Sequence, residues 1–158
     1  MGYYSMELME VVETDLEDVV KFVTERILAD EFDCLEGLQA WFADLNLKNW
    51  EDFEEFKKDT YHRIPLHADA LFDLLLICWK PNQGSAFHPH PEHGCLVKVL
   101  RGSLTEEFKE DNGDISINEY VAGDTVYICD AMGTHRVQNS SKEPVISLHL
   151  YAPGDYTP

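Results

Sequence analysis

The chain has 158 residues, 44% of them apolar, so it can bury one sizeable core and is not a disordered chain. Its formal net charge of -18 argues against binding to nucleic acid or to anionic membranes, because both need a basic surface. No segment approaches the ~20 continuous apolar residues of a membrane helix, and no basic start followed by an apolar block marks a secretory signal. We therefore expect a monomeric cytoplasmic protein with no nucleic-acid or membrane partner.

Four cysteines are widely spaced, and no two have the Cys-x-x-Cys spacing of a zinc knuckle or a thioredoxin-like motif. A cytoplasmic location would keep all of them reduced. Cys34, Cys78 and Cys129 are predicted to be buried apolar thiols. Cys95 follows a histidine-rich segment and is considered with it below.

The first sixty residues have the pattern of helices. Thr14 and Glu17 match a capping box at a helix start, and apolar residues then recur at helical spacing as far as Leu28. A second helix is predicted over 35–45. A third is predicted from Asn49, as its N-cap, to about residue 58, and its buried residues would be Trp50, Phe53 and Phe56.

From Tyr61 onward the pattern changes to short apolar segments separated by turn residues, which is typical of a β-sandwich or β-barrel. The strands are predicted at 71–79, 87–100, 104–108, 115–121, 125–129, 135–139 and 145–151. An acidic turn at 111–114 joins two of them as a hairpin. We therefore expect a single, mainly β domain of residues 1–158, in which a helical cap (1–60) packs on a β-barrel (61–158).

Three of the seven histidines are candidates for one metal site. His88 and His90 form a His-x-His pair, and side chains two apart on a strand point to the same face, so both imidazoles can reach one ion. His135 follows the turn at Gly133 and supplies a third nitrogen. Three neutral imidazoles suit iron, zinc or copper better than magnesium or calcium, which prefer oxygen ligands.

A second candidate set is the alternating row Ser147, His149 and Tyr151 in the last predicted strand. At period two, all three polar side chains share one face of the strand, and Leu148 and Leu150 take the other. Polar groups inside a barrel need hydrogen-bond partners. A relay of hydrogen bonds that leads into a metal site would provide them.

The histidine-rich segment resembles the first of two cupin motifs. Residues 84–102 read Gly-x3-His-x-His-x4-Cys-x6-Gly, and residues 123–139 resemble the second motif. Cys95 occupies the position of the usual cupin glutamate, and Glu92 is too close to His90 to replace it. The resemblance therefore implies a cupin, jelly-roll-like β-barrel whose site has three histidines in place of two histidines and a carboxylate.

A cysteine at that position is typical of eukaryotic-type cysteine dioxygenases, which the chain resembles over residues 60–154. The matching segments are Tyr61-His62-Arg63, Ile77-Cys78-Trp79, 88–102, 133–139 and 147–151. The resemblance implies that L-cysteine is oxidised by dioxygen to cysteine sulfinic acid. It also implies an Fe(II) cofactor held by His88, His90 and His135.

The same resemblance implies a substrate site formed by Arg63, Tyr61 and Trp79. Arg63, assisted by Tyr61, would hold the substrate carboxylate, because a guanidinium pairs with a carboxylate through two hydrogen bonds. The related 3-mercaptopropionate dioxygenases carry glutamine at this position. Arg63 therefore favours an α-amino acid substrate.

The catalytic roles implied by the resemblance fall on four residues. Ser147, His149 and Tyr151 would form the family's Ser-His-Tyr relay, and the Tyr151 hydroxyl would act at the open face of the metal. The family's thioether would join Cys95 to Tyr151 as a protein-derived cofactor.

Two backbone features follow. Cys95 lies five residues after His90, and this odd spacing requires a loop or bulge at 91–94 to turn the cysteine into the barrel. The resemblance also implies a cis peptide bond between Ala152 and Pro153, since cis bonds occur almost only before proline.

Four alternatives stay open. A 3-mercaptopropionate dioxygenase is disfavoured only by Arg63 and Cys95. A non-catalytic cupin that binds a ligand or stores metal would not need Arg63 together with the relay row. A manganese or zinc isomerase or decarboxylase of the same fold usually keeps the glutamate that Cys95 replaces. A plant-type N-terminal cysteine oxidase lacks the Ser-His-Tyr relay.

Overall fold

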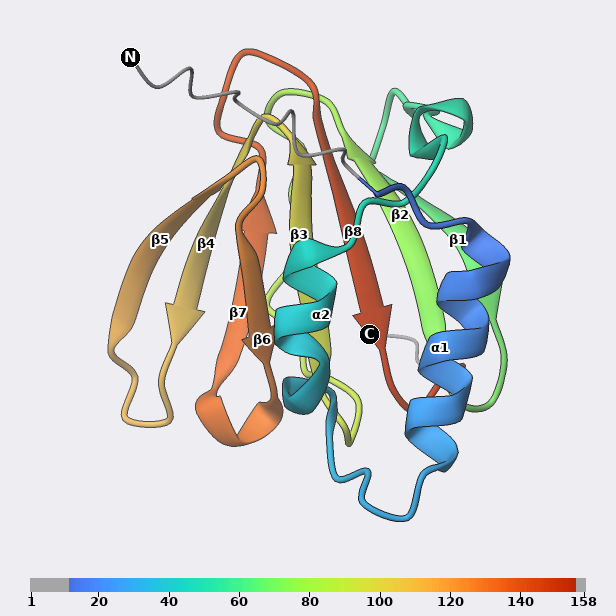
Figure 1. The fold of residues 1–158 in the computed structure, drawn as a ribbon. Helices are drawn as coiled ribbons and strands as arrows, with labels where there is room; N and C mark the ends of the chain where they lie inside the picture. Colours follow the sequence, from blue (N-terminus) through green and yellow to red (C-terminus); the bar gives the residue numbers. More distant parts are fainter. Residues whose placement is uncertain (1–11, 156–158) are drawn as a thin grey trace, which may run out of the picture.

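Two antiparallel sheets form the β part of the molecule, and helices near the N-terminus lie against one of them (Figure 1). The computed structural model describes residues 12–155. The five-stranded sheet contains, in spatial order, β1 (His62–Ala68), β2 (Asp73–Trp79), β8 (Val145–Tyr151), β3 (Cys95–Arg101) and β6 (Thr125–Ile128). The three-stranded sheet contains β5 (Ile115–Val121), β4 (Ser103–Lys109) and β7 (Thr134–Gln138). The helices are α1 (Leu16–Leu28), η1 (Leu35–Leu38), α2 (Gln39–Asp44), η2 (Trp50–Phe53) and η3 (Asp130–Met132).

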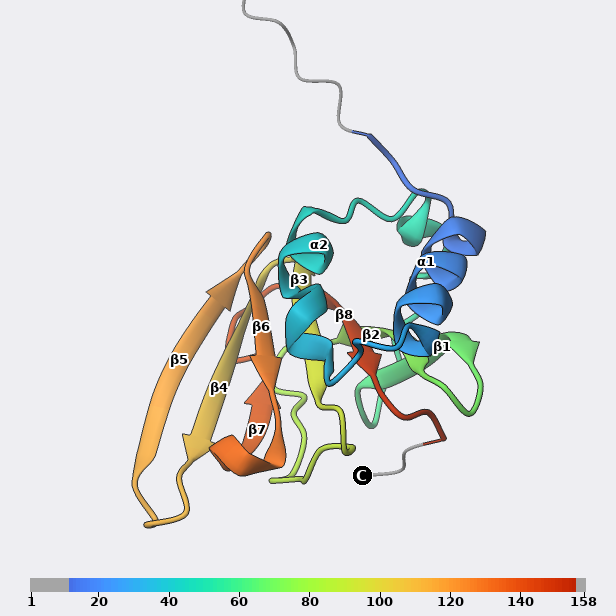
Figure 2. The same cartoon turned by 60° about the horizontal axis from the view of Figure 1, so that its bottom comes forward.

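The five-stranded sheet separates two apolar cores. The outer core lies under the helices and includes Val23, Phe42, Leu74, Leu76 and Leu148. The inner core lies between the two sheets and includes Leu75, Ile77, Val97, Leu104 and Val137. Figure 2 shows α1 and α2 together on the side of this sheet away from β5. Because β2 and β8 are covered on both faces, every residue of these two strands is buried.

The capping box predicted at the start of the first helix is wrong. α1 begins after Asp15, and no side-chain hydrogen bond caps it. Thr14 instead forms a parallel bridge to Leu47, and its N–H donates to the carbonyl oxygen of Asn46 at 2.8 Å. This backbone pairing fixes Thr14 as part of an extended segment that ties the start of α1 to the end of the helical cap.

The second predicted helix is confirmed over nearly its whole span, and the third is only partly present. The second forms as η1 followed by α2, and ends at Asp44. The third is wrong beyond a single turn, because Asn49 has a left-handed φ of 58° and no side-chain cap, whereas an N-cap needs an extended backbone. Phe53 is 40% exposed, so its predicted burial is also wrong. Trp50 and Phe56 are partly buried against the outer core.

β1 is absent from the predicted strands. It contains Pro65, and proline lacks the N–H that a central strand needs for its ladder. β1 lies at the edge of its sheet, where a proline is tolerated. The pairing of β1 with β2 places Arg63 opposite Ile77, at the entrance to the inner core.

The predicted strand over 87–100 is wrong in its first half. β3 begins at Cys95, and His88 and His90 lie in the loop before it. His88 still forms a single antiparallel bridge to His135 of β7. One bridge and the loop geometry, not a regular strand, therefore direct the two histidines.

The predicted change of phase before β3 is confirmed. A turn joins the N–H of Gly94 to the carbonyl oxygen of Pro91 at 2.9 Å, and Gly94 has a φ of 86°. A side chain on Gly94 would place its Cβ 2.5 Å from the ring of Tyr127, so glycine is required by both conformation and space. The peptide bond between Ala152 and Pro153 is cis, as predicted.

Lys98 joins β3 to the helical layer. Its side chain is buried, and Nζ donates to the carbonyl oxygen of Ala43 at 2.8 Å and to that of Leu45. Burial lowers the pKa of Lys98. The carbonyls at the end of α2 lack helical partners and carry the negative end of the helix dipole, so a buried lysine cation stabilises this end.

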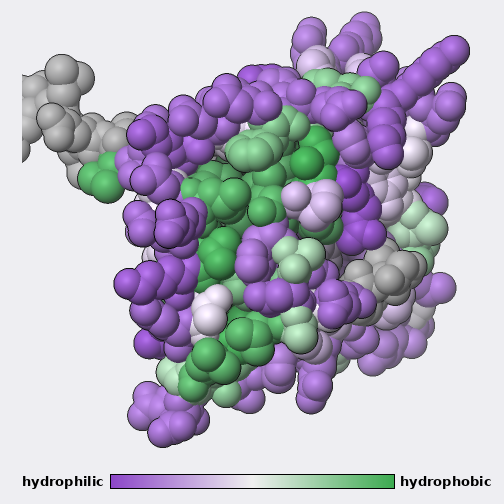
Figure 3. All heavy atoms as spheres, turned by 90° about the vertical axis from the view of Figure 1, so that its right-hand side faces the viewer, coloured by the Kyte–Doolittle hydropathy of each residue, from purple (hydrophilic) through white to green (hydrophobic). Residues whose placement is uncertain are grey.

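The surface reflects the acidic, polar composition of the chain. On the face at the right of Figure 1, an apolar patch is enclosed by hydrophilic side chains (Figure 3). The edge strand β5 also exposes Ile115, Ile117 and Val121. Among residues 12–155, no helix is long and apolar enough to cross a membrane.

Candidate metal centre and substrate pocket

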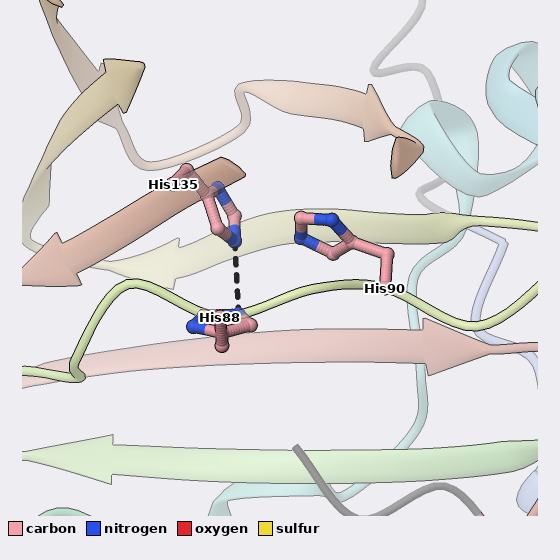
Figure 4. Close-up of side chains that lie close together, drawn as sticks. All are labelled: His88, His90 and His135. Atoms are coloured by element: carbon pink, nitrogen blue, oxygen red, sulfur yellow. Dashed lines mark hydrogen bonds between the residues drawn. The ribbon is translucent and has the colours of Figure 1, made fainter. Parts of the chain in front are cut away.

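His88, His90 and His135 point toward one another (Figure 4). The first two come from the loop before β3 and the third from β7, and their candidate ligand nitrogens all lie within 4.8 Å of one another. The ring centroid of His135 is 4.7 Å from that of His88 and 4.5 Å from that of His90. It is the only group of this kind among residues 12–155.

The hydrogen bonds of two rings leave their Nε2 atoms facing each other. Nδ1 of His88 lies 2.9 Å from the carbonyl oxygen of Ala86, and Nδ1 of His135 lies 2.7 Å from Oε2 of Glu106. Both oxygens accept, so in the neutral rings Nδ1 carries the hydrogen and Nε2 carries a lone pair. The two Nε2 atoms are 3.1 Å apart, and a shared cation would stabilise two lone pairs in this arrangement.

His90 is the third ring of the cluster and is 4% exposed. Neither of its ring nitrogens has a hydrogen-bond partner among the described residues, although Nδ1 is 3.4 Å from Oδ1 of Asp130. Burial lowers the pKa of His90 to about 4 and also lowers that of His88, so both rings are neutral at pH 7. A buried, neutral imidazole without partners, beside two Nε2 atoms that face each other, fits a transition-metal ion better than calcium, which prefers oxygen ligands.

A pocket of about 320 Å³ opens beside the histidine cluster. It is lined by His88 and His135, and its other walls include Tyr61, Arg63, Trp79, His149 and Tyr151. The ring of Tyr61 stacks on that of Trp79, with the centroids 4.6 Å apart. Among residues 12–155, Arg101 and Arg136 form ion pairs with carboxylates and Arg63 forms none, so the pocket presents a cation without a protein anion.

A chain of hydrogen bonds runs along one wall of the pocket. Nε1 of Trp79 donates to Oγ of Ser147 at 2.9 Å, and that hydroxyl lies 2.7 Å from Nε2 of His149. Nδ1 of His149 is 3.1 Å from the hydroxyl of Tyr151. Burial, together with the charge of Arg63, holds the pKa of His149 well below its usual value. This imidazole is therefore neutral and can accept one hydrogen bond while it donates another.

Cys95 and Tyr151 lie directly opposite each other on β3 and β8. Cys95 is 1% exposed, and its thiol and the Tyr151 hydroxyl are hydrogen-bonded. Burial raises the pKa of both groups. The guanidinium of Arg63 lies 5.9 Å from the centroid of the Tyr151 ring, so the arginine, the tyrosine and the cysteine are neighbours at one end of the inner core.

Comparison with known proteins identifies the family. Residues 12–157 match cysteine dioxygenase type I. The chain belongs to the cysteine dioxygenase type I family. It is 32% identical to cysteine dioxygenase type 1 of Rattus norvegicus, over 87% of this chain and 74% of the relative. It is 31% identical to the Homo sapiens protein of the same name, over 94% of this chain and 80% of the relative.

Solved structures similar to this cysteine dioxygenase family member share its fold. One is an uncharacterised protein of Klebsiella pneumoniae with a double-stranded β-helix domain, with a TM-score of 0.58 and 20% identity over 68% of this chain and 89% of that one. Another is a cupin superfamily protein of Desulfitobacterium hafniense, with a TM-score of 0.56 and 13% identity over 68% of this chain and 90% of that one. These likenesses confirm the expected cupin fold, mainly β with N-terminal helices.

The cysteine dioxygenase fold brings the predicted site residues to one end of the inner core. Most of them line the pocket. The three that do not are each buried against a residue that does, and they are His90, Cys95 and Ser147. The three clustered histidines and the hydrogen-bonded row on β8 therefore belong to one continuous site.

Glu106 belongs to this site and is absent from the predicted residues. It is buried on β4 and accepts hydrogen bonds from His135, Tyr120 and Asn118. Burial would raise the pKa of Glu106, but these hydrogen bonds outweigh it and lower the pKa, so the carboxylate is ionised. One signal in the sequence could have found it: Glu106 shares the inward period of Leu104, where an apolar side chain is expected.

Proposed function

We propose that this protein is an iron-dependent cysteine dioxygenase that oxidises L-cysteine with dioxygen to cysteine sulfinic acid. Curated relatives that are 31–32% identical are cysteine dioxygenases, which supports the reaction type. The observation that carries the proposal is the cluster of three facing imidazoles beside a pocket that contains Arg63. The four free cysteines support a reducing, cytoplasmic location, which we propose as well.

His88, His90 and His135 would hold the metal, with His88 and His135 using the Nε2 atoms that their hydrogen bonds leave available. When bound, Fe(II) would bring the substrate thiol and dioxygen together so that both oxygen atoms are transferred to sulfur. The protein's own part is to present three neutral nitrogens and to keep the pocket beside them open to a small molecule.

Arg63 would bind the carboxylate of the substrate. A guanidinium without a protein partner gains most from a carboxylate ligand, because two parallel charged hydrogen bonds can form. Arg63 lies beside Tyr151, with His88 and His135 lining the same pocket, so a carboxylate held there would place a small thiol between the arginine and the metal ligands. Tyr61, stacked on Trp79, would close the pocket next to Arg63.

The relay would control the proton of Tyr151. The indole N–H of Trp79 can only donate, so the Ser147 hydroxyl accepts from it and donates its own hydrogen bond to Nε2 of His149. The single ring hydrogen of neutral His149 then sits on Nδ1 and is donated to the Tyr151 oxygen. Tyr151 would thereby keep its own hydrogen for a hydrogen bond to a group in the pocket.

We also propose the thioether between Cys95 and Tyr151. Its formation would join the cysteine sulfur to a ring carbon next to the tyrosine hydroxyl. One hydrogen would leave the thiol and one would leave the ring, a two-electron oxidation with dioxygen as the oxidant. The direct pairing of the two residues across β3 and β8 supports the link, because no backbone movement is needed to bring them together.

Oxygen uptake by protein loaded with Fe(II) tests the proposed function. We expect uptake with L-cysteine and formation of the sulfinic acid, detected by mass spectrometry as a gain of two oxygen atoms. His135→Ala should abolish both, whereas His62→Ala, outside the cluster, should not. Faster oxidation of 3-mercaptopropionate than of cysteine would overturn the substrate assignment, and no uptake with either thiol would overturn the dioxygenase.

A further inference from the structure

Glu106 carries a buried carboxylate that accepts three side-chain hydrogen bonds. Its Oε2 is 2.7 Å from Nδ1 of His135, and the side chains of both residues are less than 5% exposed, at 4% and 3%. Its Oε1 accepts from the Tyr120 hydroxyl at 2.9 Å and from Nδ2 of Asn118 at 3.3 Å. Both carboxylate oxygens are therefore engaged, and one of them holds a candidate metal ligand.

The β4–β5 hairpin fixes this carboxylate in place. The register pairs Glu106 with Asn118 and Leu104 with Tyr120, so both supporting donors come from alternate positions of β5, on one face of the strand. On its other side, β4 pairs with β7 and sets Phe108 opposite His135. Glu106 thus reaches His135 diagonally across the ladder, with its own position held from the opposite strand.

The hydrogen bond between Glu106 and His135 also brings a negative charge close to the proposed metal site. Three imidazoles are neutral ligands, and Cys95 stands where cupins usually carry a glutamate ligand. A divalent ion at this site would therefore receive no negative charge from its protein ligands. The other carboxylate near the cluster, that of Asp130, has a side chain that is 56% exposed, so water screens it. Glu106 is buried, so water screens its charge much less than that of Asp130.

We propose that Glu106 is a positioning residue of the metal centre, which orients His135 and supplies from outside the ligand set the negative charge that the three histidines lack. The hydrogen bond holds the ring hydrogen on Nδ1 and aims Nε2 at the metal. The negative charge of Glu106 would make the His135 ring a stronger electron-pair donor to the metal, as in carboxylate–histidine–zinc sites. The inference rests on the metal site of the proposed function and not on its substrate.

The metal affinities of two Glu106 variants distinguish the orientation of His135 from the effect of the negative charge. Glu106→Gln keeps an oxygen acceptor for Nδ1 of His135 and removes the charge, whereas Glu106→Ala removes both. We expect Co²⁺, measured by competition with a chromophoric chelator, to bind about 10- to 100-fold more weakly to Glu106→Gln than to wild type. Glu106→Ala should lose at least as much. The Fe(III)/Fe(II) potential of the iron-loaded Glu106→Gln protein should also rise, because removal of a negative charge disfavours the ferric state.

Glu107→Gln is the matched control. Glu107 is the next residue of β4, and its side chain points away from the core to Arg136. The control should keep the wild-type Co²⁺ affinity and potential. Circular dichroism and thermal unfolding show whether each variant is folded, and if Glu106→Ala is not, the isosteric Gln variant decides alone.

The outcomes separate this inference from the proposed function. Wild-type affinity and an unchanged potential in Glu106→Gln would overturn the role of Glu106, even if the protein oxidises cysteine normally. Weaker metal binding with a raised potential would support it, even if cysteine proved not to be the substrate. If wild-type protein bound no divalent metal, both the inference and the proposed metal site would be wrong.

Discussion

At the scale of single residues, the proposed substrate assignment depends on Arg63, which lines the pocket. In the pocket wall, burial keeps His88 and His149 uncharged at pH 7 and raises the pKa of Tyr151. A half-buried cation beside the uncharged His88 and His149 favours an anion of matching geometry. A carboxylate satisfies this requirement, and the thiol of the same molecule is then free to face the histidines.

Replacement of Arg63 by glutamine should discriminate between thiol substrates. Loss of a charged, two-hydrogen-bond contact costs on the order of 2–4 kcal/mol in an enclosed site, so kcat/KM for L-cysteine should fall by roughly 30- to 1000-fold. Oxidation of 3-mercaptopropionate should fall much less, since related enzymes that use it carry glutamine here. Arg101→Gln, which removes a surface arginine paired with Glu54, is the control and should change neither rate. An equal loss on both thiols would count against a clamp tuned to cysteine.

Intact mass tests the proposed thioether. Wild-type protein that has turned over cysteine with iron and oxygen should be about 2 Da lighter than the metal-free protein, since the link removes two hydrogens. Cys95→Ser should keep its full mass and its iron but work more slowly, because Cys95 is not a ligand. Cys129→Ser, a partly buried cysteine outside the pocket, should still show the loss. A turned-over wild-type protein of unchanged mass would contradict the link.

At the scale of elements, the sequence predicts best where a segment's own pattern decides its structure. β8 is buried on both faces and the β4–β5 hairpin closes on a short acidic turn, and both were predicted closely. β1 has a proline at an edge, and η2 follows a left-handed asparagine, so neither shows a clean period. The three histidines proposed as metal ligands were visible as a motif. The inward period shared with Leu104 marks Glu106 as buried, but its hydrogen-bond partners depend on the register of three strands, which no local pattern records.

Lys98 should stabilise the helical layer on the sheet. Lys98→Met removes the cation that bonds the carbonyl oxygens of Ala43 and Leu45 and leaves them unpaired beneath α2. We expect the free energy of unfolding to fall by about 1–3 kcal/mol, measured by urea titration. Lys109→Met, at the exposed end of β4, should change it by less than about 0.5 kcal/mol. A stability equal to wild type in Lys98→Met would show that this contact contributes nothing net.

Asp69, in the turn between β1 and β2, should make a pH-dependent contribution to the free energy of unfolding. Oδ1 of Asp69 accepts from the N–H groups of Leu71 and Phe72 at 2.8 and 3.0 Å, and Oδ2 bonds His67. Burial would raise the pKa of Asp69, but the hydrogen bonds outweigh it and hold the pKa below the ordinary value of 3.8. The folded state therefore favours the ionised form, so this stabilisation is complete above the ordinary value and is lost as the pH falls through the lowered pKa.

Urea titrations at pH 6, 5, 4 and 3 should show this. Asp69→Ala should be less stable than wild type by about 1 kcal/mol at pH 6, and the difference should shrink between pH 4 and pH 3. Asp111→Ala, in the exposed turn of the β4–β5 hairpin, serves as the control for removal of an acidic side chain. A difference that grows on acidification would mean that the sign of the Asp69 shift is wrong.

At the scale of the whole molecule, the histidine cluster joins the two sheets. His88 and His90 lie in the connection from β2 to β3 of the five-stranded sheet, whereas His135 belongs to β7 of the three-stranded sheet. Two backbone bridges, from Gly84 to Gln138 and from His88 to His135, connect these segments. A metal bound by all three rings would therefore act as a cross-link between the two halves of the barrel, beside a pocket that the inner core does not fill.

Metal binding should accordingly stabilise the fold and not only the site. A ligand that binds the folded state alone adds RT ln(1 + [L]/Kd), which is about 2.7 kcal/mol at a free metal concentration of 100 Kd. Addition of Zn²⁺ or Co²⁺ to metal-free protein should raise the unfolding temperature, and hydrogen exchange should slow in β7 and in the loop before β3 together. In His135→Ala, the metal should neither raise the unfolding temperature nor slow hydrogen exchange in the two segments, because the remaining ligands come from one sheet only. His67→Ala, a histidine outside the cluster, should keep it. If His135→Ala gained as much stability from the metal as wild type, the ion would bind elsewhere, and the three histidines would not be the link between the sheets.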